Sequence, residues 1–287
     1  MTDNLSAPCL IDGFDLAAFV SSTLAEDLGE QGDITSAAVI PSDARFQGAM
    51  ESRDAISVAG LPIAAAFFRA LDPAAAIEIC VEEGARVPAG TVLMRISGSA
   101  RALLTAERSA LNTVQHLSGI ATMTAAYVDA IAGTGAVLLD TRKTIPGLRR
   151  IEKYAVRMGG GTNHRMGLWD AAMIKDNHVA VAGSVGEAVR RAVVAGIDRI
   201  IVEVDSIEQI EPALAAGATH LLLDNMPPPM LRAATDQVAG RVPTEASGGV
   251  RFDTIRPIAE SGVTYISVGR LTQSAPAVDI GLDFAAA

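Results

Sequence analysis

The side chains of this chain that could carry polar chemistry gather in one segment, residues 140–178, which reads DTRKTIPGLRRIEKYAVRMGGGTNHRMGLWDAAMIKDNH. The segment holds all three lysines of the protein, two of its four histidines and its only tryptophan, which are Lys143, Lys153, Lys175, His164, His178 and Trp169. It carries eight Lys or Arg residues against four Asp or Glu, whereas the whole chain has a formal net charge of −10. A positive segment in an acidic protein predicts a pocket for an anion, because a local positive field concentrates negative ligands.

The elements that would position these side chains alternate regularly after Gly133. Six short apolar runs, at 136–140, 171–175, 199–204, 220–223, 244–247 and 265–268, alternate with helical segments at 184–195, 207–216, 230–238 and 254–261. Short apolar strands separated by amphipathic helices indicate parallel βαβ units. The chain has no GxGxxG or P-loop motif, so no motif supports a doubly wound nucleotide-binding fold.

Each predicted strand ends in polar residues that could do chemistry. These ends are Asp140–Lys143, Lys175–His178, Glu203–Asp205, Asp224–Asn225, Glu245–Gly249 and Gly269–Arg270. The carboxyl ends of the strands are where (β/α) barrels bind ligands. A single polar residue there is usually a loop cap, but six such ends in register predict a binding site. Cations and acids both occur, which suits a ligand that carries phosphate or carboxylate together with metal or hydroxyl groups.

The last two strand ends contain glycine, in Ser247–Gly249 and in Val268–Arg270. Glycine lets backbone amides approach and surround a phosphate, and barrels commonly bind phosphate after their final two strands. The SGG sequence alone is a weak signal, because glycine pairs end many strands. The two loops together predict a phosphate site.

Two helices flank the start of this region. The first, 105–132, could be interrupted at Gly119, and its polar exceptions are Arg108 and His116. From spacing alone, Arg108 is either a solvated helix arginine or a functional one, and His116 is a surface or capped helix histidine. The second helix, 148–158, places four cations on one face, which predicts a solvated surface or a contact with acidic surface on a partner subunit.

The first part of the chain predicts a smaller α+β module. Residues 14–28 have the pattern of an amphipathic helix, and 44–99 contains short alternating strands interrupted by one helix at 61–71. The sequence EGARVPAG at 83–90 and its flanking strands are similar to the half-barrel of biotinyl or lipoyl carriers. A carrier needs a lysine to modify, and residues 1–142 contain none, so a purely structural half-barrel is the better interpretation.

Composition excludes several classes of protein. The 287 residues, 49% hydrophobic and 20% charged, are typical of a globular protein with a full core. A pI near 4.9 argues against nucleic-acid binding, and no apolar run approaches the ~20 residues that cross a bilayer. The N-terminus lacks the pattern of a signal peptide, and Cys9 and Cys80 lack a paired spacing. We therefore expect a cytoplasmic protein with no disulfide, no nucleic-acid partner and no membrane association.

Several motifs together resemble quinolinate phosphoribosyltransferase. The resemblance runs nearly end to end, and its central block is highly specific. The motifs are EDLGEQGDIT (26–35), TAERSALN (105–112), HLSGIAT (116–122), DTRKTIPGLRRIEKYAVRMGGGTNHRMGL (140–168), IKDNH (174–178), VEVD (202–205), LLDNM (222–226), EASGGV (245–250) and ISVGRLTQSAP (266–276).

The resemblance implies an α/β fold in two domains. The first, 1–115, would be an N-terminal α+β half-barrel module on which the tail 275–287 packs, and the second, 116–274, an open, incomplete (β/α) barrel. Such subunits pair head to tail in a homodimer, so that the N-terminal module of one covers the barrel mouth of the other. The implied reaction joins quinolinate to phosphoribosyl pyrophosphate with loss of carbon dioxide, yields nicotinate mononucleotide and pyrophosphate for NAD biosynthesis, and requires Mg2+.

The resemblance also implies a role for each matching position. The quinolinate-binding positions correspond to Arg142, Lys143, His164 and Arg165, with Thr141 beside them, and the arginine supplied by the partner subunit corresponds to Arg108. The lysine near both substrates is Lys175, and the acids around the ribose hydroxyls and Mg2+, directly or through water, are Glu203 and Asp224. The candidate catalytic residues are Lys143, Lys175, Glu203 and Asp224. The phosphate loops correspond to Ser247, Gly248, Gly249, Val268, Gly269 and Arg270.

Three positions depart from the pattern of the family. Arg270 stands where alanine is expected, Gln273 where histidine is expected, and Ile145 where threonine is usual. Arg270 could add a contact to the phosphate. The absence of the histidine puts any role of that side chain in doubt for this chain.

Three alternative functions stay open. A related phosphoribosyltransferase could act on another acid, as in the paralogues associated with molybdenum transport, although the full TRK, NHR and KDNH set favours quinolinate. A lyase could use Lys175 at a barrel strand end to form a Schiff base. A non-catalytic protein could bind phosphorylated ligands at the same loops.

Overall fold

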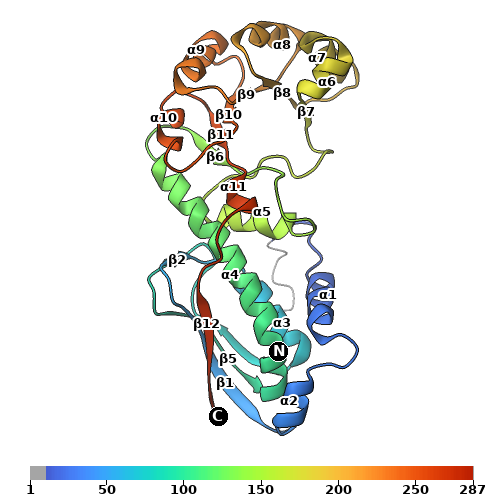
Figure 1. Ribbon diagram of the computed structural model, residues 1–287, viewed down its shortest axis with the longest axis vertical. Coiled ribbons are helices and arrows are strands. Elements are labelled where there is room, and N and C mark those ends of the chain that lie inside the picture. Colours follow the sequence, from blue (N-terminus) through green and yellow to red (C-terminus); the bar gives the residue numbers. More distant parts are fainter. Residues whose placement is uncertain (1–10, 287) are drawn as a thin grey trace, which may run out of the picture. The chain divides into compact units, whose positions relative to one another are not determined.

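The computed structural model describes residues 11–286, which divide into two compact units (Figure 1). The N-terminal unit contains residues 11–123, 150–160 and 275–286, and the C-terminal unit contains 124–149 and 161–274. The boundary expected between residues 115 and 116 falls inside helix α4 (Ala100–Ala130). The segment 150–160, expected in the barrel, belongs to the N-terminal unit.

The N-terminal unit is built on a four-stranded antiparallel sheet with the order β12-β1-β5-β3. Its strands are β1 (Arg45–Ser52), β3 (Ala76–Ile79), β5 (Thr91–Ser99) and β12 (Ile280–Ala286). The sequence pattern did not predict β12, which pairs along β1 from Ser52 opposite Ile280 to Phe46 opposite Ala286. The tail of the chain therefore completes the first sheet.

The same unit also contains shorter elements. They are the two-stranded ladder of β2 (Ile56–Ser57) and β4 (Arg86–Val87), and the helices α1 (Leu16–Leu28), α2 (Ile34–Val39) and α3 (Leu61–Leu71). Helix α3 confirms the predicted bounds 61–71. It begins there because the Glu83 carboxylate accepts hydrogen bonds from the backbone N–H groups of Gly60 and Leu61, at 2.7 and 2.9 Å, which satisfies donors that a helix start leaves unpaired.

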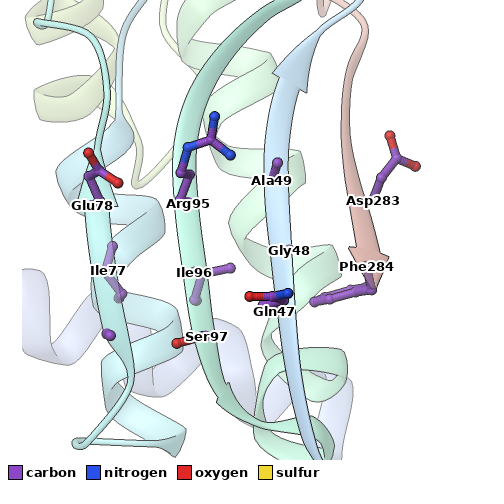
Figure 2. A pocket seen from close by; sticks show the side chains of 11 residues that line it. Gln47, Gly48, Ala49, Ile77, Glu78, Arg95, Ile96, Ser97, Asp283 and Phe284 are labelled. Atoms are coloured by element: carbon purple, nitrogen blue, oxygen red, sulfur yellow. The ribbon is translucent and has the colours of Figure 1, made fainter. Parts of the chain in front are cut away.

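One face of the four-stranded sheet is open to a hollow of about 620 Å³. Figure 2 shows Arg95 on the strand between those that carry Glu78 and Ala49, and the register places Asp283 opposite Ala49. The lining holds one cation, Arg95, between two acids and otherwise small or uncharged side chains. It lacks the grouped cations that would hold an anion.

Helix α4 is continuous from residue 100 to residue 130, so the interruption considered at Gly119 does not occur. A Cβ on Gly119 would overlap the carbonyl oxygen of Pro276 and lie 3.1 Å from its carbonyl carbon. Glycine stands at this position because the C-terminal segment crosses the helix in direct backbone contact.

The C-terminal unit confirms the predicted open barrel. Its six parallel strands have the order β6-β11-β10-β9-β8-β7, and because β6 and β7 remain at the two edges, the sheet does not close. The strands are β6 (Val137–Leu139), β7 (Ala172–Ile174), β8 (Ile200–Val204), β9 (His220–Asp224), β10 (Thr244–Ser247) and β11 (Tyr265–Ser267). The helices are α6 (Asp176–Ala182), α7 (Val185–Val194), α8 (Ile210–Ala216) after the 3-10 turn Ile207–Gln209, α9 (Pro228–Val238), α10 (Ile255–Ala259) and α11 (Arg270–Gln273).

Helix α5 (Arg149–Met158) corrects one expectation. The prediction of a solvated cationic face is wrong for Lys153, which is fully buried, although Arg157 on the same face is exposed. The neighbouring Glu152 is also fully buried and lies 2.9 Å from the Nε2 of His116. The charge pattern alone could not show this, because residues 151–156 are buried on every side of the helix.

Two further features are the membrane-spanning potential of the helices and the state of the cysteines. Among residues 11–286, no helix is both long and apolar enough to span a membrane. Cys80 is an exposed free thiol, and Cys9 lies outside the described residues.

Candidate active site

The strand ends of the C-terminal unit surround a cavity of about 910 Å³. The polar ends of all six strands contribute, because the carboxyl ends of parallel strands meet at one edge of the sheet. The predicted site residues that line the cavity are Thr141, Arg142, Lys143, His164, Arg165, Lys175, Glu203, Asp224, Ser247, Gly248, Gly249, Gly269 and Arg270.

Two predicted residues are not part of this lining. Val268 is buried, with 1% of its surface exposed, next to the lining residue Gly269. Arg108 is exposed on α4 in the N-terminal unit. The role predicted for Arg108 is taken up below.

A buried carboxylate organises the loop that carries the arginines. Asp140, at the end of β6, accepts hydrogen bonds from the backbone N–H of His164 at 2.8 Å and from the side-chain amide of Asn163 at 2.6 Å. Asp140 is fully buried, so its charge is compensated by these donors and does not line the cavity. The loop after α5 is thereby held against the end of β6.

Two arginines, Arg142 and Arg165, face the same cavity with like charge. Arg165 donates to the carbonyl oxygen of Ala171 at 2.9 Å, and burial, followed by the charge of Arg142, lowers the pKa of its guanidinium. The Nε of Arg142 is buried and has no hydrogen-bond partner among the described residues. Buried polar groups are normally paired, so this pair of arginines has the properties of an anion-binding site.

Lysine 175 follows β7 and forms an ion pair with Glu203 at the end of β8. The Lys175 side chain remains 43% exposed, and that of Glu203 is 14% exposed. The ammonium group is thus held at the cavity wall by one carboxylate and keeps donors for a ligand, since a lysine carries three.

The second acid of the predicted metal pair, Asp224, ends β9. Its Oδ2 accepts a hydrogen bond of 2.6 Å from the side-chain amide of Asn225. Within residues 11–286, no three His, Cys, Asp or Glu side chains are grouped to hold a metal by themselves. Mg2+ commonly binds through one or two carboxylates, with substrate oxygens and water completing its coordination, so the residues that could hold it here are Glu203 and Asp224.

The glycine loop after β10 is packed against the end of β9. The backbone N–H of Asn225 donates to the carbonyl of Ser247 at 2.9 Å, and both Asn225 and Gly248 have positive φ, 55° and 92°. A Cβ on Gly248 would lie 2.5 Å from the Cγ of Asn225, so only glycine fits. The hydroxyls of Ser247 and Ser267 are 3.0 Å apart, which joins the two loops predicted to bind phosphate.

An aromatic contact anchors the far side of the same loop. The Phe252 ring lies 5.4 Å from the Tyr127 ring on α4, at an interplanar angle of 71°. Next to it, Arg251 forms a two-point ion pair with Asp253, with both N···O distances at 3.0 Å. The loop is therefore held at both ends, and its backbone amides are kept in place.

The cavity also includes residues to which the sequence gave no individual role, although Asn225 and Glu245 belong to predicted polar strand ends. They are Met173, Leu222, Asn225, Glu245, Val250, Arg251, Ser267 and Gln273. The sequence could have indicated Glu245, because it lies in the apolar run 244–247. An acid in a central, buried strand must be paired with another polar group. The apolar residues show no such signal, since strand periodicity does not say which face meets the ligand.

Two family models match the chain. The model described as Quinolinate phosphoribosyl transferase, C-terminal domain, matches residues 120–283, and the model described as Quinolinate phosphoribosyl transferase, N-terminal domain, matches residues 33–118. The two matches together cover both units.

Individual proteins agree with these models. The nicotinate-nucleotide pyrophosphorylase (carboxylating) of Mycobacterium leprae is 45% identical over 273 residues, which are 92% of this chain and 95% of that protein. The crystal structure of NadC from Streptococcus pyogenes has a TM-score of 0.92 at 37% identity and covers 100% of both chains. The crystal structure of nicotinate-nucleotide pyrophosphorylase from Ehrlichia chaffeensis has a TM-score of 0.91 at 37% identity and covers 95% of this chain and 100% of that one.

Proposed function

We infer that this chain, which belongs to the quinolinate phosphoribosyltransferase family, is an enzyme that carries out the reaction of that family. It transfers the phosphoribosyl group of phosphoribosyl pyrophosphate to the ring nitrogen of quinolinate. Loss of one carboxyl group as carbon dioxide then gives nicotinate mononucleotide, and pyrophosphate is released. The enzyme is thus a pentosyltransferase of NAD biosynthesis.

The observation that carries this proposal is the pair of arginines with an unpaired buried donor. Quinolinate has two adjacent carboxylates that repel each other, so its site needs several fixed cations. Arg142 and Arg165 offer planar forks that match carboxylates, and Lys143 and His164 line the same cavity. The two guanidinium groups repel each other until an anion enters, which favours binding of a dicarboxylate.

The remaining strand ends suit the second substrate. The 5-phosphate would lie against the amides of Gly248, Gly249 and Gly269, with Arg270 as an added cation. Glu203 and Asp224 would accept hydrogen bonds from the ribose hydroxyls, and Lys175 would donate to oxygens between the two substrates. Displacement at the sugar carbon passes through an oxocarbenium-like state, so positioning and electrostatics provide most of the catalysis.

We propose Mg2+ as the cofactor, with Glu203 and Asp224 as its protein ligands, directly or through water. Bound there with the pyrophosphate oxygens, it would neutralise the charge of the leaving group. Lys175 would keep Glu203 oriented toward the substrate through their ion pair, and the Asn225 amide would do the same for Asp224.

Decarboxylation follows from the chemistry of the transferred ring. Once the ring nitrogen is alkylated it is a cation next to the carbon that bears the departing carboxylate. The electron pair left by carbon dioxide therefore stays on that carbon, where the adjacent positive nitrogen stabilises it, until the carbon takes up a proton from water. The protein has to keep the second carboxylate bound meanwhile, a task that suits the arginine pair.

The assay of the proposal is release of pyrophosphate and carbon dioxide from quinolinate, phosphoribosyl pyrophosphate and Mg2+. The matched variant is Arg142→Lys, which keeps the charge and removes the planar fork, and we expect it to raise the KM for quinolinate at least about tenfold, or about 1.4 kcal/mol. Turnover with another acid and none with quinolinate would refute the proposal in favour of a related phosphoribosyltransferase.

We further propose a homodimer with shared sites, in which Arg108 of one subunit serves the cavity of the other. The exposure of Arg108 on α4 supports this arrangement. Mixing Arg108→Ala with Lys143→Ala should restore part of the activity, because some mixed dimers then contain one intact site. A mixture as inactive as either parent would show that Arg108 does not act across subunits.

The lyase alternative is less well supported. A Schiff-base lysine is activated by desolvation, whereas Lys175 is 43% exposed and paired with Glu203. Borohydride trapping of a keto-acid adduct on Lys175 would favour it, and ligand affinity without turnover would favour a binding protein. The cytoplasmic location stays a proposal that rests on the composition of the chain.

A further inference from the structure

A buried carboxylate beneath the cavity binds two histidines at once. The side chain of Glu245, on the central strand β10, is fully buried, and its Oε2 lies 3.1 Å from the Nε2 of His164 and 3.0 Å from the Nε2 of His220. The two imidazoles are almost as enclosed, with 4% and 8% of their side chains exposed. The function proposed above uses neither Glu245 nor His220.

The partners of His164 determine which of its nitrogens carries the proton. Its Nδ1 accepts a hydrogen bond from the backbone N–H of Arg165 at 2.6 Å, so this nitrogen must present a lone pair. Its Nε2 faces the Glu245 carboxylate, which only accepts, so this nitrogen must carry hydrogen. The two contacts together define a neutral ring protonated at Nε2, as inferred from the hydrogen-bond network.

The contact of Glu245 with His220 is different. The Nε2 of His220 is at bonding distance but makes no aligned hydrogen bond, and the Oε1 of Glu245 is buried without a partner among the described residues. The His220 ring is held in place by stacking on Tyr265, with centroids 5.5 Å apart and an interplanar angle of 23°. His220 therefore compensates the carboxylate electrostatically, whereas His164 receives the directional bond.

This arrangement links Glu245 to the anion site. Arg165 is the residue whose backbone N–H the imidazole accepts, and its guanidinium lines the cavity. The same backbone is held from the other side, because Asp140 accepts from the N–H of His164. If the His164 ring changed its tautomer, two N–H groups would face each other at Nδ1, and the Arg165 backbone would have to move.

We propose that Glu245 is a positioning residue for the acid substrate. By accepting a hydrogen bond from the Nε2 of His164, Glu245 keeps that ring in the tautomer whose Nδ1 accepts from the backbone N–H of Arg165. The main chain of Arg165, and thus its guanidinium, is thereby held in the anion site. The substrate assignment rests on the function proposed above. The tautomer of His164 does not depend on which acid is the substrate. The substrate assignment and the role of Glu245 can therefore fail separately.

The test uses the full-length protein with three variants. Glu245→Leu removes both acceptor oxygens, Glu245→Asp keeps the charge on a shorter side chain, and His220→Gln removes the second imidazole as a matched control. Two quantities are measured. The first is the chemical shift of the histidine ring nitrogens in proton–nitrogen NMR spectra at about pH 8, where an unperturbed histidine is neutral. The second is the KM for each substrate.

For Glu245→Leu we expect His164 to lose the pure Nε2–H form, because no acceptor faces its Nε2. The KM for quinolinate should rise about 10- to 100-fold, as for other residues that orient a ligand-binding side chain, with the KM for phosphoribosyl pyrophosphate changed much less. His220→Gln should retain the Nε2–H signal of His164. Glu245→Asp should retain it with an intermediate KM for quinolinate, and it answers the question if Glu245→Leu does not fold.

Three results would overturn the proposal. The first is an unchanged His164 signal in a folded Glu245→Leu. The second is a His164 ring that carries its proton on Nδ1 in the wild type. The third is an equal rise in both KM values, which would mark Glu245 as structural only. If the wild-type protein uses another acid instead of quinolinate, the proposed substrate fails, while the NMR result still decides the role of Glu245.

Discussion

The contact between Gly248 and Asn225 allows a sharp test of how the phosphate loop is built. In Gly248→Ala the new methyl group would meet the Asn225 side chain, with Cγ at 2.5 Å, and the Asn225 backbone nitrogen at 2.9 Å. The matched control is Gly249→Ala in the same loop. Gly249 also has positive φ, 59°, but a Cβ there meets nothing within 4 Å.

The two substitutions differ in one physical respect. Both force alanine into a left-handed conformation, which costs about 1–2 kcal/mol. Gly248→Ala must also displace Asn225, whose backbone N–H bonds to Ser247 at 2.9 Å and whose amide bonds to Asp224 at 2.6 Å. Losing these two hydrogen bonds adds about 2 kcal/mol, so the expected totals are about 1–2 and about 3–4 kcal/mol.

Thermal unfolding and substrate kinetics read out this difference. One kcal/mol shifts the Tm of a protein of this size by about 2–4 °C, so Gly248→Ala should lose about 4–8 °C more than Gly249→Ala. If the loop instead shifts without unfolding, the same 2 kcal/mol appears as a roughly 30-fold larger rise in the KM for phosphoribosyl pyrophosphate. The double variant Asn225→Gly with Gly248→Ala should recover part of the loss, because the side-chain overlap is removed.

Equal losses in the two single variants, or no recovery in the double variant, would refute this explanation. The first result would show that backbone conformation alone makes glycine necessary in the loop. The second would show that the Asn225 side chain is not what excludes a methyl group at position 248.

Three further predictions concern the same unit. Burial alone would raise the pKa of Glu245, but the hydrogen bond from His164 and the contact with His220 outweigh it and lower the pKa from its usual 4.5 to about 2. The ionised carboxylate therefore contributes about 3 kcal/mol of stability above pH 4.5, and this contribution is lost as the pH falls toward 2. The difference in unfolding free energy between wild type and Glu245→Gln should shrink between these two pH values. A constant difference would contradict the lowered pKa of Glu245. Phe252→Ala should lower the free energy of unfolding by about 1 kcal/mol, because its contact with Tyr127 is lost, and should raise the KM for phosphoribosyl pyrophosphate. Phe252→Leu should lower the free energy of unfolding less. Equal effects of the two variants would exclude an aromatic contribution. Chelation of Mg2+ should abolish turnover but leave quinolinate binding intact in calorimetry, because the arginine pair needs no metal. Loss of binding would show that quinolinate binding also depends on the metal.

Local sequence patterns were sufficient for most elements of the C-terminal unit. Strands of three to five residues confirm the six predicted apolar runs, because alternation of short apolar strands with helices is a local property. The convergence of polar strand ends on one cavity also followed from the sequence, since parallel strands place their carboxyl ends on one side. The roles of individual residues came from resemblance to a family and remain to be tested.

The tertiary structure alone decided features that join distant segments. Strand β12 pairs with β1 although more than two hundred residues separate them, and no local pattern encodes such a partner. The burial of Lys153 depends on what surrounds α5, and a helical wheel shows only which residues share a face.

The site itself shows the same division. The sequence placed Arg142 and the glycine loops at predicted strand ends, and so predicted an anion site. Only the folded chain brings His164 and His220 onto one oxygen of Glu245 and leaves the Nε of Arg142 without a partner. Periodicity determines which residues face the sheet or the solvent, whereas hydrogen-bond partners depend on distances of a few tenths of an ångström between segments far apart in the chain.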